Sequence, residues 1–457
     1  MTSELPKTSV AETLARKIVA LRSGALPPAT TRKCEELLID VAGLCVTARN
    51  EDYITSALAG WDDDGPCTVI GHRRTLTASG AAFVNGTAAH GEDFDDTFEG
   101  GPVHAGAVIV PAVLAACERH HPDGRMALTG IAVGTEVLCR LSLVVPKAVH
   151  KAGFHPTAIF GAMGAAAGVG VALGLDAKQI VDALGIAGSM ASGIIEYLAE
   201  GAWTKRLHAG WAAQSGIRAA LLAKQGFAGP RTVFEGVHGL FHGFAHTTKG
   251  DYDALIGDFG DRWVTDTLAF KPYPCGTMAQ PYIDCARRLA ARGIKPEDIT
   301  QIVCDVAEGT VHRLWEPLAD KQRPRNGYAA KFATPYLLAT GFVHGGVGLG
   351  AFTETAIGDA RVLALAARVK FVIDPDNPYP ANYTGHIKAT LKDGSVLEER
   401  QPYLRGGAQE PLTRQDVTDK FRLNTQHGGW DDAQSDVTLK LLAGLYQGRI
   451  DLSVLRR

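Results

Sequence analysis

The sequence predicts a mostly α-helical protein in which an all-helical domain is interrupted by a smaller α+β domain. Apolar residues recur at helical spacing through most of the first 264 residues and again after residue 413, whereas alternating strand patterns are concentrated between them. A chain of 457 residues is long enough for two domains. We therefore expect a helical domain over residues 1–264, an α+β domain over 265–405, and a C-terminal helical segment over 406–457 that packs on the first domain.

Helix signals follow one another through the first domain. Ser9 and Glu12 form a capping box ahead of an apolar stripe, and Pro28 opens a second helical pattern. Later segments with helical spacing end near glycine; they are residues 105–120, 127–145, 159–173, 177–199 and 209–225. The uncharged stretch 154–175 is rich in Gly and Ala and only weakly apolar, so we expect a buried helix there rather than a membrane span.

Strand signals define the second domain. Residues 264–274 look strand-like, a helix is expected over 277–292, and apolar residues alternate with polar ones in 299–314 and around residue 369. Asp393-Gly394 separates two further alternating runs, which is a strong β-hairpin signal.

Composition and charge exclude several classes of protein. Hydrophobic residues make up 46% of the chain, as in ordinary globular proteins, and a formal net charge of −3 gives no reason to bind nucleic acid or an anionic membrane. The eight cysteines show no C-x-x-C spacing, which argues against a zinc or iron–sulfur site and fits reduced thiols. The N-terminus has no signal-peptide pattern, so we expect a cytoplasmic protein.

The densest polar cluster runs through residues 90–99. Such an acidic run is most often a solvated loop. Asp95, Asp96 and Glu99 also match the D-D-x-x-E pattern with which helical terpene synthases hold Mg²⁺ and diphosphate. That class predicts a second metal motif and an aromatic-lined pocket; the sequence has no such second motif, and its aromatic content is only 7%.

The same cluster is also consistent with an acid–base loop. In this interpretation Asp93 or Thr97 faces a pocket that His104 closes. His155 precedes Pro156 at the start of a predicted helix, where free N–H groups can bind an anion, although a histidine there is more often structural.

A basic cluster interrupts the apolar pattern before residue 209. Lys205, Arg206 and His208 suit a polycarboxylate, while a solvated loop is an equally good interpretation. Lys271 lies where the α+β domain begins. The sequence contains no H-E-x-x-H, G-x-S-x-G or Walker A motif, so these three kinds of enzyme are not indicated.

Taken in order, these motifs resemble the MmgE/PrpD family, which includes 2-methylcitrate dehydratase, cis-aconitate decarboxylase and iminodisuccinate epimerase. The matching pieces are Asn85-Gly86, His90 with DFDDT at 93–97, His104, GFHPT at 153–157, TKRLHAG at 204–210, KPYPC at 271–275 and AKFATPY at 330–336. Each piece is weak alone, but the ordered set is specific and fits residues 8–430.

The resemblance implies an all-helical domain with an inserted α+β lid, in a homodimer that needs no metal and no organic cofactor. It implies a pocket formed by Asp93, Thr97, His104, His155, Lys205, Lys271 and Tyr336. We expect Thr97 to bind substrate and the other six to be catalytic, and we add Arg206 and His208 as further substrate-binding candidates. The implied activity is that of a lyase, a dehydratase or decarboxylase, that abstracts a proton beside a carboxylate of a small di- or tricarboxylate. Epimerisation of an iminodisuccinate-like substrate is the alternative.

These expectations give one mechanistic hypothesis. Lys205, Lys271 and His155 hold substrate carboxylates and stabilise developing negative charge. His104, oriented by Asp93, is the base, and the tyrosine of AKFATPY is the acid. A Mg²⁺-diphosphate enzyme and a polycarboxylate-binding protein without turnover are the alternatives from other classes.

Overall fold

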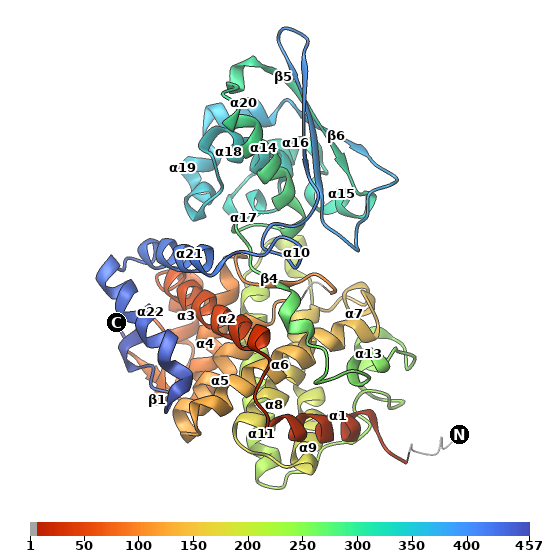
Figure 1. Ribbon diagram of the computed structural model, residues 1–457, viewed down its shortest axis with the longest axis vertical. Coiled ribbons are helices and arrows are strands. Elements are labelled where there is room, and N and C mark those ends of the chain that lie inside the picture. The colour runs from red at the N-terminus through yellow and green to blue at the C-terminus, as the bar shows by residue number, and fades with distance from the viewer. Residues whose placement is uncertain (1–6, 102) are drawn as a thin grey trace. The chain divides into compact units, whose positions relative to one another are not determined.

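The computed structural model describes residues 7–101 and 103–457, so Pro102 and the first six residues of the predicted helical domain lie outside the described part. The chain divides into two compact units (Figure 1). Unit 1 comprises Met1–Gly91, Asp95–Leu268 and Thr413–Arg457, and unit 2 comprises Glu92–Phe94 and Ala269–Leu412. The chain is mostly helical, as predicted; the assignment of unit 2 as a lid stays a prediction.

Unit 1 is built from helices. The longer ones are α1 (Val10–Leu21), α2 (Pro28–Thr47), α4 (Ala78–Gly91), α5 (Gly106–His120), α6 (Gly124–Val144), α8 (Pro156–Ala172), α9 (Ala177–Met190), α11 (Thr204–Lys224), α21 (Arg414–His427) and α22 (Asp432–Gly444). The shorter ones are α3 (Asp52–Ala59), α7 (Ala148–Lys151), α10 (Tyr197–Glu200), α12 (Leu240–Ala245), α13 (Asp253–Ile256) and the 3-10 turns η1 (Val264–Thr267), η5 (Leu445–Gln447) and η6 (Ser453–Leu455). Its strands are short: β1 (Asp64–Thr68) pairs with β2 (Thr75–Leu76), and β3 (Thr97–Phe98) lies within the polar cluster 90–99.

Local signals explain where several of these helices begin and end. Ser9 and Glu12 form the predicted capping box at the start of α1. The predicted helix over 177–199 is too long, because α9 ends at Met190. The backbone becomes extended at Ala191, and Gly193 has a φ of +135°, which glycine adopts more readily than other residues.

Helix α8 lies in the core of unit 1. All of its 17 residues are buried, so the uncharged stretch is a core helix, as predicted. It packs closely on α6 through glycine: a Cβ on Gly130 would lie 2.7 Å from the carbonyl oxygen of Gly168. Among the described residues, α6 itself is long and apolar enough to cross a membrane, but 89% of its most apolar window is buried inside the protein, as in a core helix.

Residues 413–457 belong to unit 1, whereas residues 406–412 of the predicted C-terminal segment belong to unit 2. Helix α21 packs on α2, and Lys420 Nζ lies 2.7 Å from Asp40 Oδ1. The two side chains are 6% and 1% exposed. Because breaking a buried ion pair by removing one partner costs about 3–5 kcal/mol, this contact ties segments far apart in the sequence together.

Unit 2 contains one four-stranded sheet in the order β6-β5-β7-β8. Its strands are β5 (Ile299–Val306), β6 (Val369–Ile373), β7 (Gly385–Leu391) and β8 (Val396–Gln401). Strand β5 is parallel to β6 and antiparallel to β7, which forms the predicted hairpin with β8; Gly394 has a φ of +85° in its turn.

The remaining elements of unit 2 are helical. They are η2 (Thr277–Ala279), α14 (Gln280–Ala291), η3 (Pro296–Asp298), α15 (Glu308–Leu314), α16 (Leu318–Gln322), α17 (Gly327–Ala330), α18 (Thr334–His344), η4 (Leu349–Phe352), α19 (Glu354–Ile357) and α20 (Ala360–Ala366). The helix expected over 277–292 is confirmed and packs on β7 and β8.

Two strand predictions are wrong. Residues 264–274 form the turn η1 and the two-residue strand β4 (Leu268–Ala269), and Pro272 and Pro274 follow in a segment without regular structure. Proline lacks the N–H that a ladder needs, which limits any strand here. Residues 308–314 continue the alternation of β5 in sequence but form α15.

Candidate active site

Three helices of unit 1 begin beside the histidines that the sequence selected. His104 lies two residues before α5, His155 is the N-cap of α8, and His208 lies near the start of α11. The His104 backbone N–H donates to Thr157 Oγ1 at 3.2 Å, and His155 Nδ1 lies 3.1 Å from His208 Nδ1. The starts of α5, α8 and α11 therefore meet. Helix N-termini favour negative charge. The Asp96 carboxyl group already binds the first N–H groups of α5, so the starts of α8 and α11 are the ones suited to a further anion.

The His104 ring is held in one tautomer. Its Nδ1 lies 2.7 Å from the carbonyl oxygen of Asp96 and 3.3 Å from Thr97 Oγ1. A carbonyl oxygen only accepts hydrogen bonds, so Nδ1 carries the hydrogen and Nε2 keeps its lone pair. The neutral His104 ring therefore has its basic nitrogen at Nε2.

His90, His104, His155 and His208 form a row that we call the imidazole cluster. The rings follow one another in the order His104, His90, His155, His208. The distances between successive ring centroids are 5.0, 5.6 and 5.3 Å. Burial, followed by the electrostatic effect of neighbouring His90 and Lys205, lowers the pKa of His208 to about 4. Burial likewise holds the pKa of His155 well below its usual range. Both rings are therefore neutral near pH 7.

Lys205 brings a cation to the imidazole cluster. It lies in the first turn of α11, is 5% exposed, and its charge lowers the pKa of both His155 and His208. A cation at a helix N-terminus is opposed by the helix dipole, and an anion bound there would offset this cost. Arg206 instead lies over the Tyr53 ring, 4.3 Å from its centroid. The solvated-loop interpretation of this segment is wrong, because it begins a helix and buries Lys205 and His208.

The acidic run is also buried, so its interpretation as a solvated loop is wrong. Asp95 and Asp96 are both inaccessible to solvent. The Asp96 carboxyl group accepts the backbone N–H groups of Ala105 and Gly106 at 3.0 and 2.9 Å, where α5 begins. Burial, with Asp95 and Asp40 nearby, raises the pKa of Asp96 to about 8. Both Asp96 carboxyl oxygens thus accept backbone N–H groups of α5, a contact that does not suit the D-D-x-x-E set of Mg²⁺ ligands.

Three side chains lie close enough together to be tested as metal ligands. His90, Asp95 and His104 offer ligand atoms within 4.8 Å of one another. However, His90 Nδ1 lies 2.6 Å from Asp95 Oδ2, and His104 Nδ1 faces the Asp96 carbonyl. The Nδ1 atoms of both rings therefore make hydrogen bonds, and we interpret the three residues as a hydrogen-bonded network.

Unit 2 holds Asp93 and Lys271, and a further lysine supports them. Lys271 Nζ donates to the Asp93 carbonyl oxygen at 2.9 Å, and Asp93 has a φ of 56°, in the left-handed region. Lys331 Nζ donates to the Glu92 carbonyl oxygen and to Glu92 Oε2, each at 2.7 Å. Two buried lysines thus hold the segment 92–94 on unit 2.

Tyr336 lies in the first turn of α18. Its hydroxyl donates to the carbonyl oxygen of Ala351 at 2.6 Å, and burial raises its pKa. To act as an acid, the hydroxyl must first leave this carbonyl. The catalytic roles of Tyr336, Asp93 and Lys271 stay predictions.

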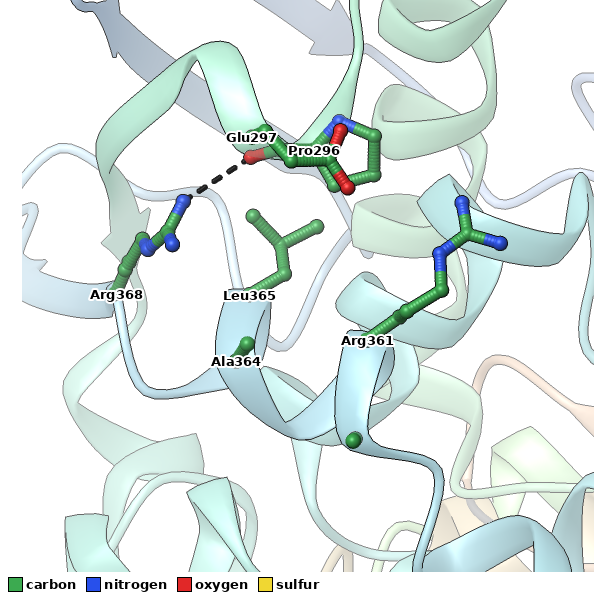
Figure 2. A pocket seen from close by; sticks show the side chains of 7 residues that line it. Pro296, Glu297, Arg361, Ala364, Leu365 and Arg368 are labelled. Carbon is green, nitrogen blue, oxygen red and sulfur yellow. Dashed lines mark hydrogen bonds between the residues drawn. The ribbon is translucent and has the colours of Figure 1, made fainter.

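The cavity in Figure 2 involves other residues of unit 2. It has a volume of about 200 Å³ and is lined by η3 and α20, with Glu297, Arg361 and Arg368 at its edges. Arg368 donates to the carbonyl oxygen of Pro296 at 3.1 Å. No residue predicted for the site lines this cavity.

The structure adds three residues to the set selected from the sequence. His90 belongs to the imidazole cluster, Lys331 holds the segment 92–94, and the Tyr197 ring lies 6.1 Å from that of His155 and 5.7 Å from that of His208. His90 and Lys331 lie inside motifs that match the family, and this position in the sequence could have identified them as site residues. Tyr197 lies outside them.

The fold and the site define a mostly helical protein with a buried row of imidazoles and a lysine at converging helix N-termini. Its family follows from sequence comparison. The MmgE/PrpD N-terminal domain matches residues 12–253, and the MmgE/PrpD C-terminal domain matches residues 273–442. The chain belongs to the MmgE/PrpD family, as its motifs predicted.

Named relatives include two kinds of lyase. The chain is 30% identical over 445 residues to cis-aconitate decarboxylase of Homo sapiens, covering 93% of this chain and 90% of the relative. Against cis-aconitate decarboxylase of Mus musculus the identity is 29% over 431 residues, covering 91% and 86%. A mitochondrial 2-methylcitrate dehydratase of Yarrowia lipolytica is 27% identical over 214 residues, covering 42% of this chain and 38% of the relative.

Proposed function

We propose that this protein is a lyase that acts on a small tricarboxylate by proton transfer beside a carboxylate. The observation that carries the proposal is the meeting of three helix N-termini, the imidazole cluster and buried Lys205 inside unit 1. The site is rich in hydrogen-bond donors and positive potential, and such preorganised groups stabilise charge that develops during a reaction.

Binding of the substrate follows from the same charges. Lys205 is proposed to hold one carboxylate, with the start of α8 and Thr97 as further donors. The neutral rings of His155 and His208 can donate a hydrogen bond without adding charge. This arrangement orients a polyanion and excludes water from the reacting carbon.

His104 is the proposed proton-transfer group. In a decarboxylation, a C–C bond breaks, carbon dioxide leaves, and the electron pair that remains on carbon takes a proton from Nε2 of the protonated ring. In a dehydration, Nε2 of the neutral ring removes the proton beside the carboxylate. The C–H electron pair forms the C=C bond, the C–O bond breaks, and the hydroxyl group takes a proton from a second acid and leaves as water. Both reactions use side chains alone, and the tautomer of His104 places the exchanging proton at Nε2.

Decarboxylation of a cis-aconitate-like substrate is the favoured reaction. The similarity to cis-aconitate decarboxylases extends over nearly the whole chain, whereas the similarity to 2-methylcitrate dehydratase covers 42% of it. Dehydration of a 2-methylcitrate-like substrate is the second candidate, on the strength of that relative.

A substrate panel tests the proposal. The purified protein is incubated in D₂O with cis-aconitate, 2-methylcitrate, citrate, iminodisuccinate and tartrate, and each mixture is followed by NMR and mass spectrometry. Loss of carbon dioxide from cis-aconitate is expected, and loss of water from 2-methylcitrate would select the second candidate. Exchange of substrate protons without loss of mass would indicate an epimerase. Binding of a panel compound without any chemical change would indicate a polycarboxylate-binding protein and would refute the proposal that the protein is a lyase.

We also propose that the protein is a cytoplasmic homodimer. Trp203, the N-cap of α11, and Leu207 and Trp211 within this helix are large, exposed apolar side chains four residues apart. Such patches mark protein interfaces. All eight cysteines are unpaired and buried, which supports a reducing compartment.

A further inference from the structure

We propose that Asp95, held in position by His90, is the counter-ion that sets the basicity of His104. Both are positioning residues that act through His104, and their effect on turnover rests on the proposed function. The hydrogen-bond geometry of unit 1 carries the proposal, because one buried carboxylate lies between two imidazoles.

The contacts assign the two sides of this carboxylate. Asp95 Oδ2 lies 2.6 Å from His90 Nδ1 and 3.7 Å from His104 Nδ1. Neither the Asp95 nor the His90 side chain is accessible to solvent, while His104 is 12% exposed. His90 thus fixes the carboxylate oxygen by a short hydrogen bond, and the same oxygen lies within ion-pair distance of His104.

The position of this charge matters when His104 gains a proton. The Nδ1 hydrogen of His104 already points at the Asp96 carbonyl, so the second proton arrives at Nε2 and the whole ring becomes positive. An opposite charge within about 4–6 Å favours the charged form of a titrating group. Asp95 therefore stabilises the imidazolium that proton transfer creates, while a neutral residue there would not.

Other charged groups around His104 do not replace Asp95. From the segment 95–97, Asp96 is held neutral by a pKa raised to about 8 and bonds the backbone of α5. From α4 comes His90, from α8 comes His155, and from α11 come His208 and the cation Lys205. None of these four side chains carries a negative charge: the imidazoles are neutral or, when protonated, positive, and Lys205 is a cation. A positive charge on any of them would lower the basicity of His104, whereas the negative charge of Asp95 raises it.

The imidazole of His90 also has a free end. Its Nε2 is buried and has no hydrogen-bond partner among the described residues. The ring therefore contributes through its Nδ1 donor, and an asparagine amide at this position would place a donor at a similar point. A small residue would remove the short hydrogen bond that His90 donates to the buried Asp95 carboxylate, which favours the neutral form of this acid.

Two readouts test the proposal. The first is the titration of the His104 ring, followed by NMR of protein labelled with carbon-13 at histidine, without substrate and with His104→Gln used for assignment. The second is the pH profile of kcat/KM. Asp95→Asn should move the titration of His104 to lower pH by about one unit or more. The limb of the kcat/KM pH profile that His104 controls should move by the same amount. Asp95→Asn should also lower kcat by about tenfold or more while KM changes little.

Matched variants separate positioning from simple structural damage. His90→Ala should move the titration in the same direction as Asp95→Asn, and His90→Asn should restore it. Glu118→Gln removes another buried carboxylate of unit 1, one that bonds Thr68 and Arg456, and should lower the melting temperature without moving the titration. If Asp95→Asn does not fold, the unaltered protein still gives a test, because slowly exchanging, far-downfield Nδ1 protons are expected for both His90 and His104.

The outcomes are distinct. Unmoved titrations in Asp95→Asn and His90→Ala, or no such downfield protons in the unaltered protein, would overturn the inference. A shifted titration in a protein that transforms none of the panel substrates would support the counter-ion and refute the proposed function. A shifted titration together with a shifted pH profile supports both.

Discussion

Replacing Lys205 by methionine tests whether the buried cation of α11 binds substrate. Methionine keeps the length of the side chain and removes the charge. Two unit charges about 4 Å apart attract by about 4 kcal/mol at an effective dielectric constant of about 20. Allowing for desolvation, we expect a loss of about 3 kcal/mol of transition-state stabilisation, which corresponds to a decrease in kcat/KM of about a hundredfold. The assay is steady-state turnover of the panel substrate that the protein transforms.

A second buried lysine provides the control. Lys420 is 6% exposed and pairs with Asp40 at 2.7 Å. Lys420→Met leaves this carboxylate buried without its partner, so it should lower the free energy of unfolding by about 3–5 kcal/mol while folded molecules keep their kcat/KM. Lys205→Met should instead lower kcat/KM, and the loss of a cation that the helix dipole opposes should offset part of any loss of stability. Near-normal kcat/KM in Lys205→Met, or a stability loss as large as that of Lys420→Met, would refute the reasoning.

Three further predictions concern pH, segment 92–94 and assembly. The pKa of His208 is about 4 in the folded protein and about 6.5 in the unfolded chain, so the unfolded chain binds more protons between these pH values. The free energy of unfolding should therefore fall by about 3 kcal/mol as the pH drops from about 6.5 to about 4. Thermal melts of His208→Gln should lack this contribution. Lys331→Met should speed hydrogen exchange at residues 92–94, since Glu92 loses both of its bonds to Nζ; unchanged exchange would contradict this. Leu207→Glu should yield monomers in light scattering, whereas Leu423→Glu, an exposed site on α21, should not; dimers in both variants would exclude this face.

Much of the fold was predictable where the signal is local. The capping box at Ser9 and the turn at Asp393-Gly394 each set a structure through neighbouring residues, and both are confirmed. Helix α4 was not predicted, because all 14 of its residues are buried and no polar face marks the helical period. The end of α9 at Met190 was missed because nothing in the apolar pattern changes there.

The site was predictable as a set of residues but not as a network. His104, His155 and His208 stood in motifs whose order indicated the family, and the structure brings their rings together within unit 1. The pairing of His90 with Asp95 depends on how the loop after α4 folds back, which no spacing rule gives. The burial of the acidic run could not be predicted either, because four carboxylates within five positions normally indicate a loop exposed to solvent.

The most direct test of the account is single-turnover NMR with cis-aconitate in D₂O, comparing the protein with its His104→Gln variant. Glutamine can still donate a hydrogen bond to the Asp96 carbonyl, but its amide neither accepts nor releases a proton near pH 7. We predict that the unaltered protein releases carbon dioxide and places deuterium on the carbon that loses it or on its conjugated neighbour, and that the variant is slower by about a hundredfold or more. Turnover by the variant at close to the rate of the unaltered protein would contradict the account.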